Sequence, residues 1–197
     1  EYDAAAQLVT LKQWPRAISV LEAYRRSYPA DPRQRDVTRN LAVAYAEANR
    51  PGDAAVEFER ISETSGEEAA LRREALATAA DLYEKAGNVP KTRTTLERFV
   101  QRYPTPVAAA IETRQRLADI AGKAGDGAAQ LSWYREIVKA DAAAGPERSD
   151  RTRLLAARAQ LALAAPQRDA FKAIRLVAPL KRSLDQKRKA LDQALQA

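Results

Sequence analysis

Cysteine, histidine and methionine are all absent from this 197-residue sequence, and glycine occurs only seven times. Without cysteine the chain can form neither disulfide bonds nor a thiolate nucleophile, a composition that fits an oxidising compartment but does not require one. Without histidine it lacks the most common general base, and zinc loses its nitrogen as well as its sulfur ligands. β-Branched residues never alternate with polar ones over the length of a strand, so no sheet is predicted.

The remaining residues give little support to enzyme chemistry. Serines such as Ser62 and Ser132 have no histidine to activate them. Gly125-Asp126-Gly127 has neither the length nor the lysine of a phosphate-binding loop. No run of 18 apolar residues is present, so no membrane span is predicted. We therefore expect a protein that is not an enzyme and has no metal or cofactor.

Charge is distributed unevenly along the chain. The net charge is +7, yet residues 1–149 hold 22 basic and 22 acidic side chains, whereas residues 150–197 hold 11 basic and 4 acidic ones. The basic excess therefore belongs to the C-terminal quarter. Because the sequence starts at Glu1 without a methionine and ends within a helical pattern, we interpret it as a fragment of a longer protein.

Side chains of similar size return at a nearly constant interval. Proline and glycine divide the chain into segments in which apolar residues recur three and four apart, the period of an amphipathic helix. Leu8, Tyr45, Tyr83 and Ala121 align at successive steps of 37, 38 and 38 residues. A single helix pair cannot bury its apolar face, so a fixed step predicts pairs that stack on one another.

The predicted fold is all-α: an α-α superhelix, or solenoid, of about eleven helices. The predicted ranges are 1–30, 31–66, 67–104, 105–145 and 146–178 for five helix pairs, and 179–197 for a final helix that opens a further pair. Pro166 is expected to separate a helix that Ser149 caps from another helix over residues 167–177. Pro179 suits the first turn of the final helix, because its missing N–H needs no partner there.

The repeated pattern resembles the tetratricopeptide repeat, in which W-x2-L-G-x2-Y on a first helix precedes A-x3-F, A and P on a second. The second pair supplies Leu41, Ala42 and Tyr45, followed by Ala54 and Phe58, and the likeness extends from residue 1 to about residue 142. No tryptophan opens a first helix, alanine replaces the glycine, and the step exceeds the family's roughly 34 residues. The resemblance implies stacked helix pairs that bind a protein or peptide.

Two second helices end in a narrower pattern, an aromatic residue followed by Tyr-Pro, at Tyr24–Pro29 and Leu96–Pro104. This ending and the segment Ala178–Leu184 are similar to periplasmic repeat proteins of Gram-negative bacteria. That group includes outer-membrane-assembly lipoproteins and proteins associated with Tol- or TonB-type energy transducers. The resemblance implies a periplasmic location, with a cytoplasmic one as the alternative.

The family resemblance also implies a binding surface, because the first helices of such pairs line the concave side of the solenoid. Projecting the helix period from Tyr45 and Tyr83 predicts which side chains face that side. The predicted partner-binding residues are Arg39, Val43, Glu47, Ala77, Asp81, Lys85, Gln115, Asp119 and Lys123. The predicted groove therefore has mixed charge.

Two sets of side chains in the C-terminal quarter recur every seven residues. The apolar set is Val177, Leu184 and Leu191, and the basic stripe is Arg168, Arg175, Arg182 and Lys189. An uncovered apolar face on the final helix would allow self-association. A nucleic-acid module would add stacking aromatic residues, and Phe171 is the one aromatic residue in this quarter, so nucleic-acid binding is not predicted.

Together these features predict a protein–protein interaction scaffold that binds a partner peptide or helix on its concave face, within a periplasmic envelope assembly. Two alternatives stay open. One is the non-catalytic helical arm of a cell-wall enzyme. The other is a cytoplasmic adaptor whose basic C-terminal helices bind nucleic acid or a regulatory partner.

Overall fold

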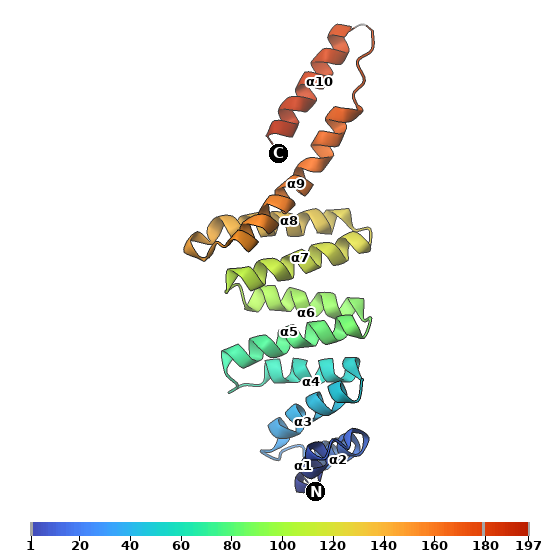
Figure 1. Ribbon diagram of the computed structural model, residues 1–197, viewed down its shortest axis with the longest axis vertical. Helices are drawn as coiled ribbons and strands as arrows, with labels where there is room; N and C mark the ends of the chain where they lie inside the picture. The colour runs from blue at the N-terminus through green and yellow to red at the C-terminus, as the bar shows by residue number, and fades with distance from the viewer. Residues whose placement is uncertain (1, 179, 197) are drawn as a thin grey trace. The chain divides into compact units, whose positions relative to one another are not determined.

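The computed structural model describes residues 2–178 and 180–196, and all its regular structure is helical. These residues form ten α-helices and one short 3₁₀ helix, with no β-strand among them (Figure 1). The predicted all-α class is therefore confirmed, and the helix count is close to the expected eleven. Pro179, predicted in the first turn of the final helix, lies outside the described residues.

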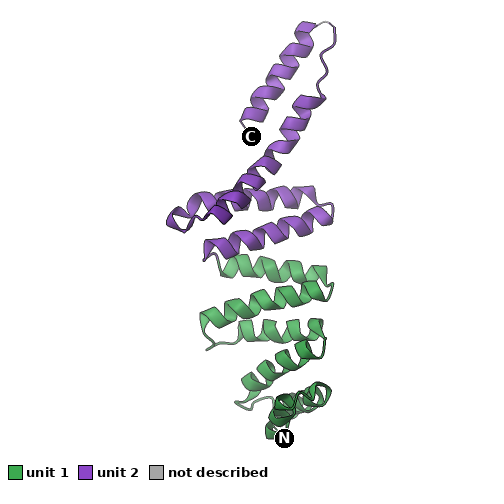
Figure 2. Cartoon of the chain, in the orientation of Figure 1, with its two compact units in different colours: residues 1–103 green, residues 104–197 purple. Residues whose placement is uncertain are grey.

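The chain divides into two compact units, residues 1–103 and residues 104–197 (Figure 2). The first unit contains α1 Tyr2–Thr10, α2 Trp14–Ser27, α3 Gln34–Glu47, α4 Pro51–Glu63, α5 Ala69–Lys85 and α6 Val89–Arg102. The second contains α7 Val107–Lys123, α8 Gly127–Ala143, the 3₁₀ helix Gly145–Glu147, α9 Asp150–Ala173 and α10 Leu180–Leu195.

Inside each unit, packing follows the order of the sequence. In the first unit every helix packs against the next one along the chain, and α1 also contacts α3. In the second unit α7 packs against α8, α8 against α9 and α9 against α10, while α7 also contacts α9. Contacts between sequence neighbours are those expected when helix pairs stack as repeats.

Four helix pairs close through the same turn. Lys12, Asn49, Gly87 and Gly125 have positive φ angles of 55°, 56°, 72° and 75° and follow one another at the repeat step. In each turn the next residue donates its N–H to the carbonyl oxygen five residues earlier, as that of Asn88 does to Tyr83 at 2.9 Å. This is the Schellman ending of a helix, in which one left-handed residue lets the chain reverse.

The second helices begin with residues that suit a helix N-terminus. Proline stands in the first turn of α2, α4 and α6, where its missing N–H leaves no helical bond unmade. Asn88 caps α6 by accepting a hydrogen bond from the N–H of Lys91 at 3.1 Å. Asp126 caps α8 by accepting one from the N–H of Ala129 at 2.9 Å. Turn and cap chemistry together therefore place the second helix of each pair.

The five first helices all bury an alanine at the same position of the repeat. These residues are Ala5, Ala42, Ala80, Ala118 and Ala156, of which none is more than 6 % exposed. The repeat step thus continues into α9, beyond residue 142, where the sequence likeness stops. Protein interiors are close-packed, so a buried alanine at a helix–helix contact leaves no room for a larger side chain.

Replacing Ala80 with leucine is expected to lower the free energy of unfolding by about 1–3 kcal/mol, because the added atoms must displace packed neighbours. Urea unfolding followed by circular dichroism measures the change. Ala70→Leu is the matched control, since Ala70 is exposed on the same helix and its substitution should stay within about 0.5 kcal/mol of wild type. Equal unfolding midpoints for the two variants would contradict close packing at Ala80.

The C-terminal region departs from the prediction at Pro166. The expected break there is wrong, because α9 runs through it as one helix of 24 residues. Pro166 lies on the exposed side of α9, where water can solvate the carbonyl group that its missing N–H leaves unbonded. The cap at Ser149 is confirmed: its hydroxyl oxygen accepts from the N–H of Thr152 at 3.2 Å in a capping box. Residues 150–173 are therefore one helix, and α10 folds back along it (Figure 1).

Candidate functional site

The nine predicted binding residues occupy three first helices, three on each. They are Arg39, Val43 and Glu47 on α3, Ala77, Asp81 and Lys85 on α5, and Gln115, Asp119 and Lys123 on α7. All are exposed except Ala77 and Gln115, which are half-buried. The sets on α3 and α5 belong to the first unit, and the set on α7 belongs to the second.

A groove of about 350 Å³ opens on the first unit between α3 and α5. It is lined by Arg39, Ala42 and Val43 from α3, Phe58 and Ile61 from α4, and Leu71, Glu74, Ala75 and Thr78 from α5. Ala42, Ile61 and Ala75 are buried, and Phe58 packs against them. Val43 and Leu71 remain 46 % and 38 % exposed. A concave surface with accessible apolar walls and a few polar groups is suited to an apolar side chain of a partner.

Arg39, one of the two predicted residues that line this groove, is held by the protein itself. Its guanidinium donates to both carboxylate oxygens of Glu67 at 2.7 Å and lies 3.7 Å from Asp36. The neighbouring Arg35 donates to the carbonyl oxygen of Ser65 at 2.9 Å. These bonds tie the connection between α4 and α5 to α3. Val43, rather than Arg39, is therefore the groove residue most available to a partner.

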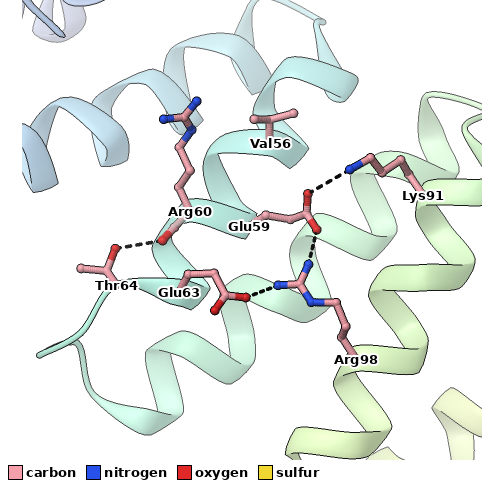
Figure 3. Close-up of a pocket in the computed structure, with 7 residues that line it drawn as sticks. All are labelled: Val56, Glu59, Arg60, Glu63, Thr64, Lys91 and Arg98. Carbon is pink, nitrogen blue, oxygen red and sulfur yellow. Dashed lines mark hydrogen bonds and ion pairs between the residues drawn. The ribbon is translucent and has the colours of Figure 1, made fainter.

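A second hollow, of about 440 Å³, lies between the second helices α4 and α6. It is lined by Val56, Glu59, Arg60, Glu63, Thr64, Lys91 and Arg98. Figure 3 shows the Glu59 and Glu63 carboxylates of α4 facing the Lys91 and Arg98 side chains of α6. Arg98 pairs with Glu59 at 2.6 Å and also with Glu63, and Arg102 pairs with Glu63 at 2.8 Å.

The pKa values around this hollow reflect the same pairing. The hydrogen bond from Arg102 holds the pKa of Glu63 below its ordinary value. Burial, together with the bond that its hydroxyl donates to Glu59 at 2.6 Å, raises the pKa of Tyr83. The carboxylates are thus matched by cations of the adjoining helix. The arrangement is that of a contact between helices, in which each partly exposed pair contributes only about 0–1 kcal/mol.

The preceding repeat contains a related arrangement. The Tyr45 hydroxyl donates to Glu22 of α2, as the Tyr83 hydroxyl donates to Glu59 of α4. The Arg25 guanidinium of α2 donates two hydrogen bonds, at 2.7 and 2.6 Å, to the two carboxylate oxygens of the buried Glu57 of α4. In both places a first-helix tyrosine is anchored to the second helix of the pair before it.

Sequence reasoning missed these charge contacts, although the signal was present. Glu59 and Glu63 are four residues apart, as are Arg98 and Arg102, and residues at this spacing share one face of a helix. Each glutamate precedes its arginine by 39 residues, close to the repeat step. Charges spaced by one repeat on successive second helices could have been predicted to pair.

The four residues of the predicted basic stripe do not share one helix face. Arg168 lies on α9, where it pairs with Asp169 at 3.0 Å. Arg175 lies in the connection after α9, whereas Arg182 and Lys189 lie on α10. A seven-residue spacing aligns side chains only along one continuous helix, and the chain reverses between these residues.

In residues 2–178 and 180–196, no helix is both long and apolar enough to cross a membrane. The same residues contain no group of three or more acidic side chains arranged to hold a metal ion.

Comparison with known proteins identifies one repeat. The sequence model of the tetratricopeptide repeat matches residues 74–106, which include most of α5 and all of α6. No curated protein matches the chain. Tetratricopeptide repeats generally mediate protein–protein interaction and are generally not catalytic. The match supports the family resemblance, and with it the expectation of a protein partner.

Proposed function

We propose that this protein is a non-catalytic scaffold that binds a segment of a partner protein in the groove between α3 and α5. The observation that carries the proposal is the exposure of Val43 and Leu71 on the walls of that groove. Apolar side chains in a concave site give a partner surface to bury, and the surrounding Glu74 and Thr78 supply polar contacts that orient it.

The proposal includes a place in a periplasmic envelope assembly. Its support is the likeness between the ends of α2 and α6. Tyr28 and Tyr103 each follow the last helical residue and donate their N–H groups to the carbonyl oxygens of Tyr24 and Phe99 at 2.9 Å. The aromatic rings pack at 4.9 Å between Tyr24 and Tyr28 and at 5.5 Å between Phe99 and Tyr103. This is the ending that resembles periplasmic repeat proteins.

A photo-reactive amino acid placed at Val43 is expected to crosslink a partner protein in cells that contain the protein natively. The matched control is Val56, which is 39 % exposed but faces the hollow between α4 and α6. The partner crosslinked from Val43 is expected to be an envelope protein. In a binding titration with that purified partner, Val43→Glu should weaken binding on the order of tenfold or more, because it places a charge against buried apolar surface.

The control variant Val56→Glu should leave the affinity unchanged. Equal crosslinking from Val43 and Val56, or an affinity that Val43→Glu does not alter, would exclude the groove as the binding site. A cytoplasmic partner crosslinked from Val43 would keep the groove but overturn the envelope assignment.

A further inference from the structure

We propose that the outer face of α10 binds an acidic amphipathic helix of a partner protein. Leu180, Leu184, Leu191 and Leu195 are 58 %, 50 %, 40 % and 77 % exposed. At 3.6 residues per turn these four side chains fall within an arc of about 60° on the helix surface. They form one apolar row, here termed the leucine stripe.

The side of α10 that packs on α9 is buried, in contrast to the exposed leucine stripe. Ser183 and Ala190 lie on this buried side. The Ser183 hydroxyl donates to the carbonyl oxygen of Val177 at 2.9 Å, and Lys187 donates to that of Ile174 at 3.0 Å. The Lys187 ammonium group also lies 4.8 Å from the centre of the Phe171 ring. These contacts fix the rotation of α10 about its axis, so the leucine stripe is presented beside the contact with α9 and not within it.

The leucine stripe forms an apolar seam along one side of α10. Leu184 and Leu191 are seven residues apart, and Leu180 and Leu195 each lie four residues outside them, so all four share one side of the helix. Lys181 and Arg188, also seven apart and exposed, follow one border of the stripe. In paired helices the charges that border the seam face those of the partner and select it. A partner with a leucine seam bordered by glutamate or aspartate therefore complements α10.

Charge argues against a second copy of the chain as the occupant. The α10 sequence contains five basic and two acidic residues. Two copies that met antiparallel through their leucine stripes would place Lys181 and Arg188 against the same residues of the other copy. Like charges at these positions destabilise helix pairing.

A lipid surface is also the weaker fit. Helices that lie in a membrane interface have a polar face rich in lysine and arginine, and aromatic residues commonly anchor their apolar face. In α10, Asp185 and Asp192 lie one row beyond Lys181 and Arg188, and the helix contains no aromatic residue. Alternating charge beside the leucine stripe suits the mixed charges of a protein helix better than an anionic bilayer.

The test uses two synthetic probes and the whole chain. Each probe is a peptide of about three heptads with a leucine seam, bordered by glutamate in one and by lysine in the other. In a fluorescence titration the glutamate probe is expected to bind on the order of tenfold or more tightly than the lysine probe. Leu184→Asp with Leu191→Asp should abolish binding and leave the helical circular dichroism unchanged, because both leucines are exposed.

Charge-reversal variants test directly whether the basic border of the leucine stripe selects the partner. Lys181→Glu with Arg188→Glu should reverse the preference, so that the lysine probe becomes the tighter binder. The same charge change at Arg182 and Lys189, which lie on the other side of α10, should leave the original preference intact. Three outcomes would overturn the proposal: equal binding of both probes, a dimer in light scattering that Leu184→Asp dissolves, or binding to phosphatidylserine vesicles without binding to the glutamate probe.

Discussion

Leu41→Ala is expected to lower the free energy of unfolding by about 2–5 kcal/mol, because it leaves a cavity at a fully buried position. Leu41 belongs to a core cluster that includes Leu21 of α2, Val37 of α3 and Ala54 of α4. The cavity would therefore weaken the contact between two successive helix pairs as well as one helix. Urea unfolding followed by far-UV circular dichroism measures the loss.

Leu11→Ala provides the control for this experiment. Leu11 is 65 % exposed in the turn between α1 and α2, so its truncation should change the unfolding free energy by no more than about 0.5 kcal/mol. A Leu41→Ala variant as stable as Leu11→Ala would mean that α3 does not pack between its neighbours. The stacked-pair fold of the first unit would then be untenable.

Arg148→Ala is expected to destabilise the second unit by about 3 kcal/mol, the lower end of the range for a broken buried ion pair. The Asp141 side chain is only 3 % exposed, and both guanidinium bonds from Arg148, at 2.7 and 3.0 Å, reach its Oδ2 atom. Removing the arginine leaves a buried carboxylate without its counter-charge. The partial exposure of Arg148, at 43 %, is the reason to expect the lower end.

The pH dependence of this variant distinguishes an ion-pair effect from lost packing. Burial raises the pKa of Asp141. The hydrogen bonds and charge of Arg148, with further contributions from Thr152 and Arg153, outweigh burial and hold the pKa below its ordinary value of 3.8. The wild-type carboxylate therefore stabilises the fold above that value, and its contribution is lost as the pH falls through the lower folded pKa. In Arg148→Ala the groups that oppose burial are fewer, so the pKa of Asp141 rises and its carboxylate is protonated at a higher pH than in wild type.

The difference in unfolding free energy between wild type and Arg148→Ala, here termed the stability gap, should consequently become smaller as the pH is lowered from 7 toward 3. Thermal unfolding across this range measures the gap. The double variant Asp141→Asn with Arg148→Ala should recover part of the stability that Arg148→Ala loses at neutral pH, since no buried charge remains. A gap that stays constant with pH, with no recovery in the double variant, would attribute the loss to packing alone.

The register of the repeats is predictable from the sequence, since it follows from local chemistry. The step between Tyr45 and Tyr83 marks equivalent buried positions, and the left-handed turns at Asn49 and Gly87 follow the same interval. Each turn, cap and helix period depends on residues close together in the chain. The break expected at Pro166 does not occur. Pro166 is exposed on α9, and its exposure depends on how the helices pack and not on its neighbours in the sequence.

In the candidate site, too, the sequence predicted features that depend on residues within one helix and missed contacts between helices. The helix period placed Arg39 and Val43 on the same side of α3, which the family resemblance predicts to be the binding side, and both side chains are exposed. It could not predict that Glu67, 28 residues away, would hold Arg39, or that Leu71 would form the facing wall of the groove. Those relationships depend on how α5 lies against α3 and α4.

Periodicity, composition and turn residues thus determined an all-helical chain of stacked pairs. The folded arrangement decided which exposed side chains already have partners, as Arg39 and Arg98 do, and which remain uncovered, as Val43 and Leu184 do. The reason is physical: a helix repeats every few residues along the chain, whereas an ion pair or a groove joins residues that only packing between helices brings within contact distance.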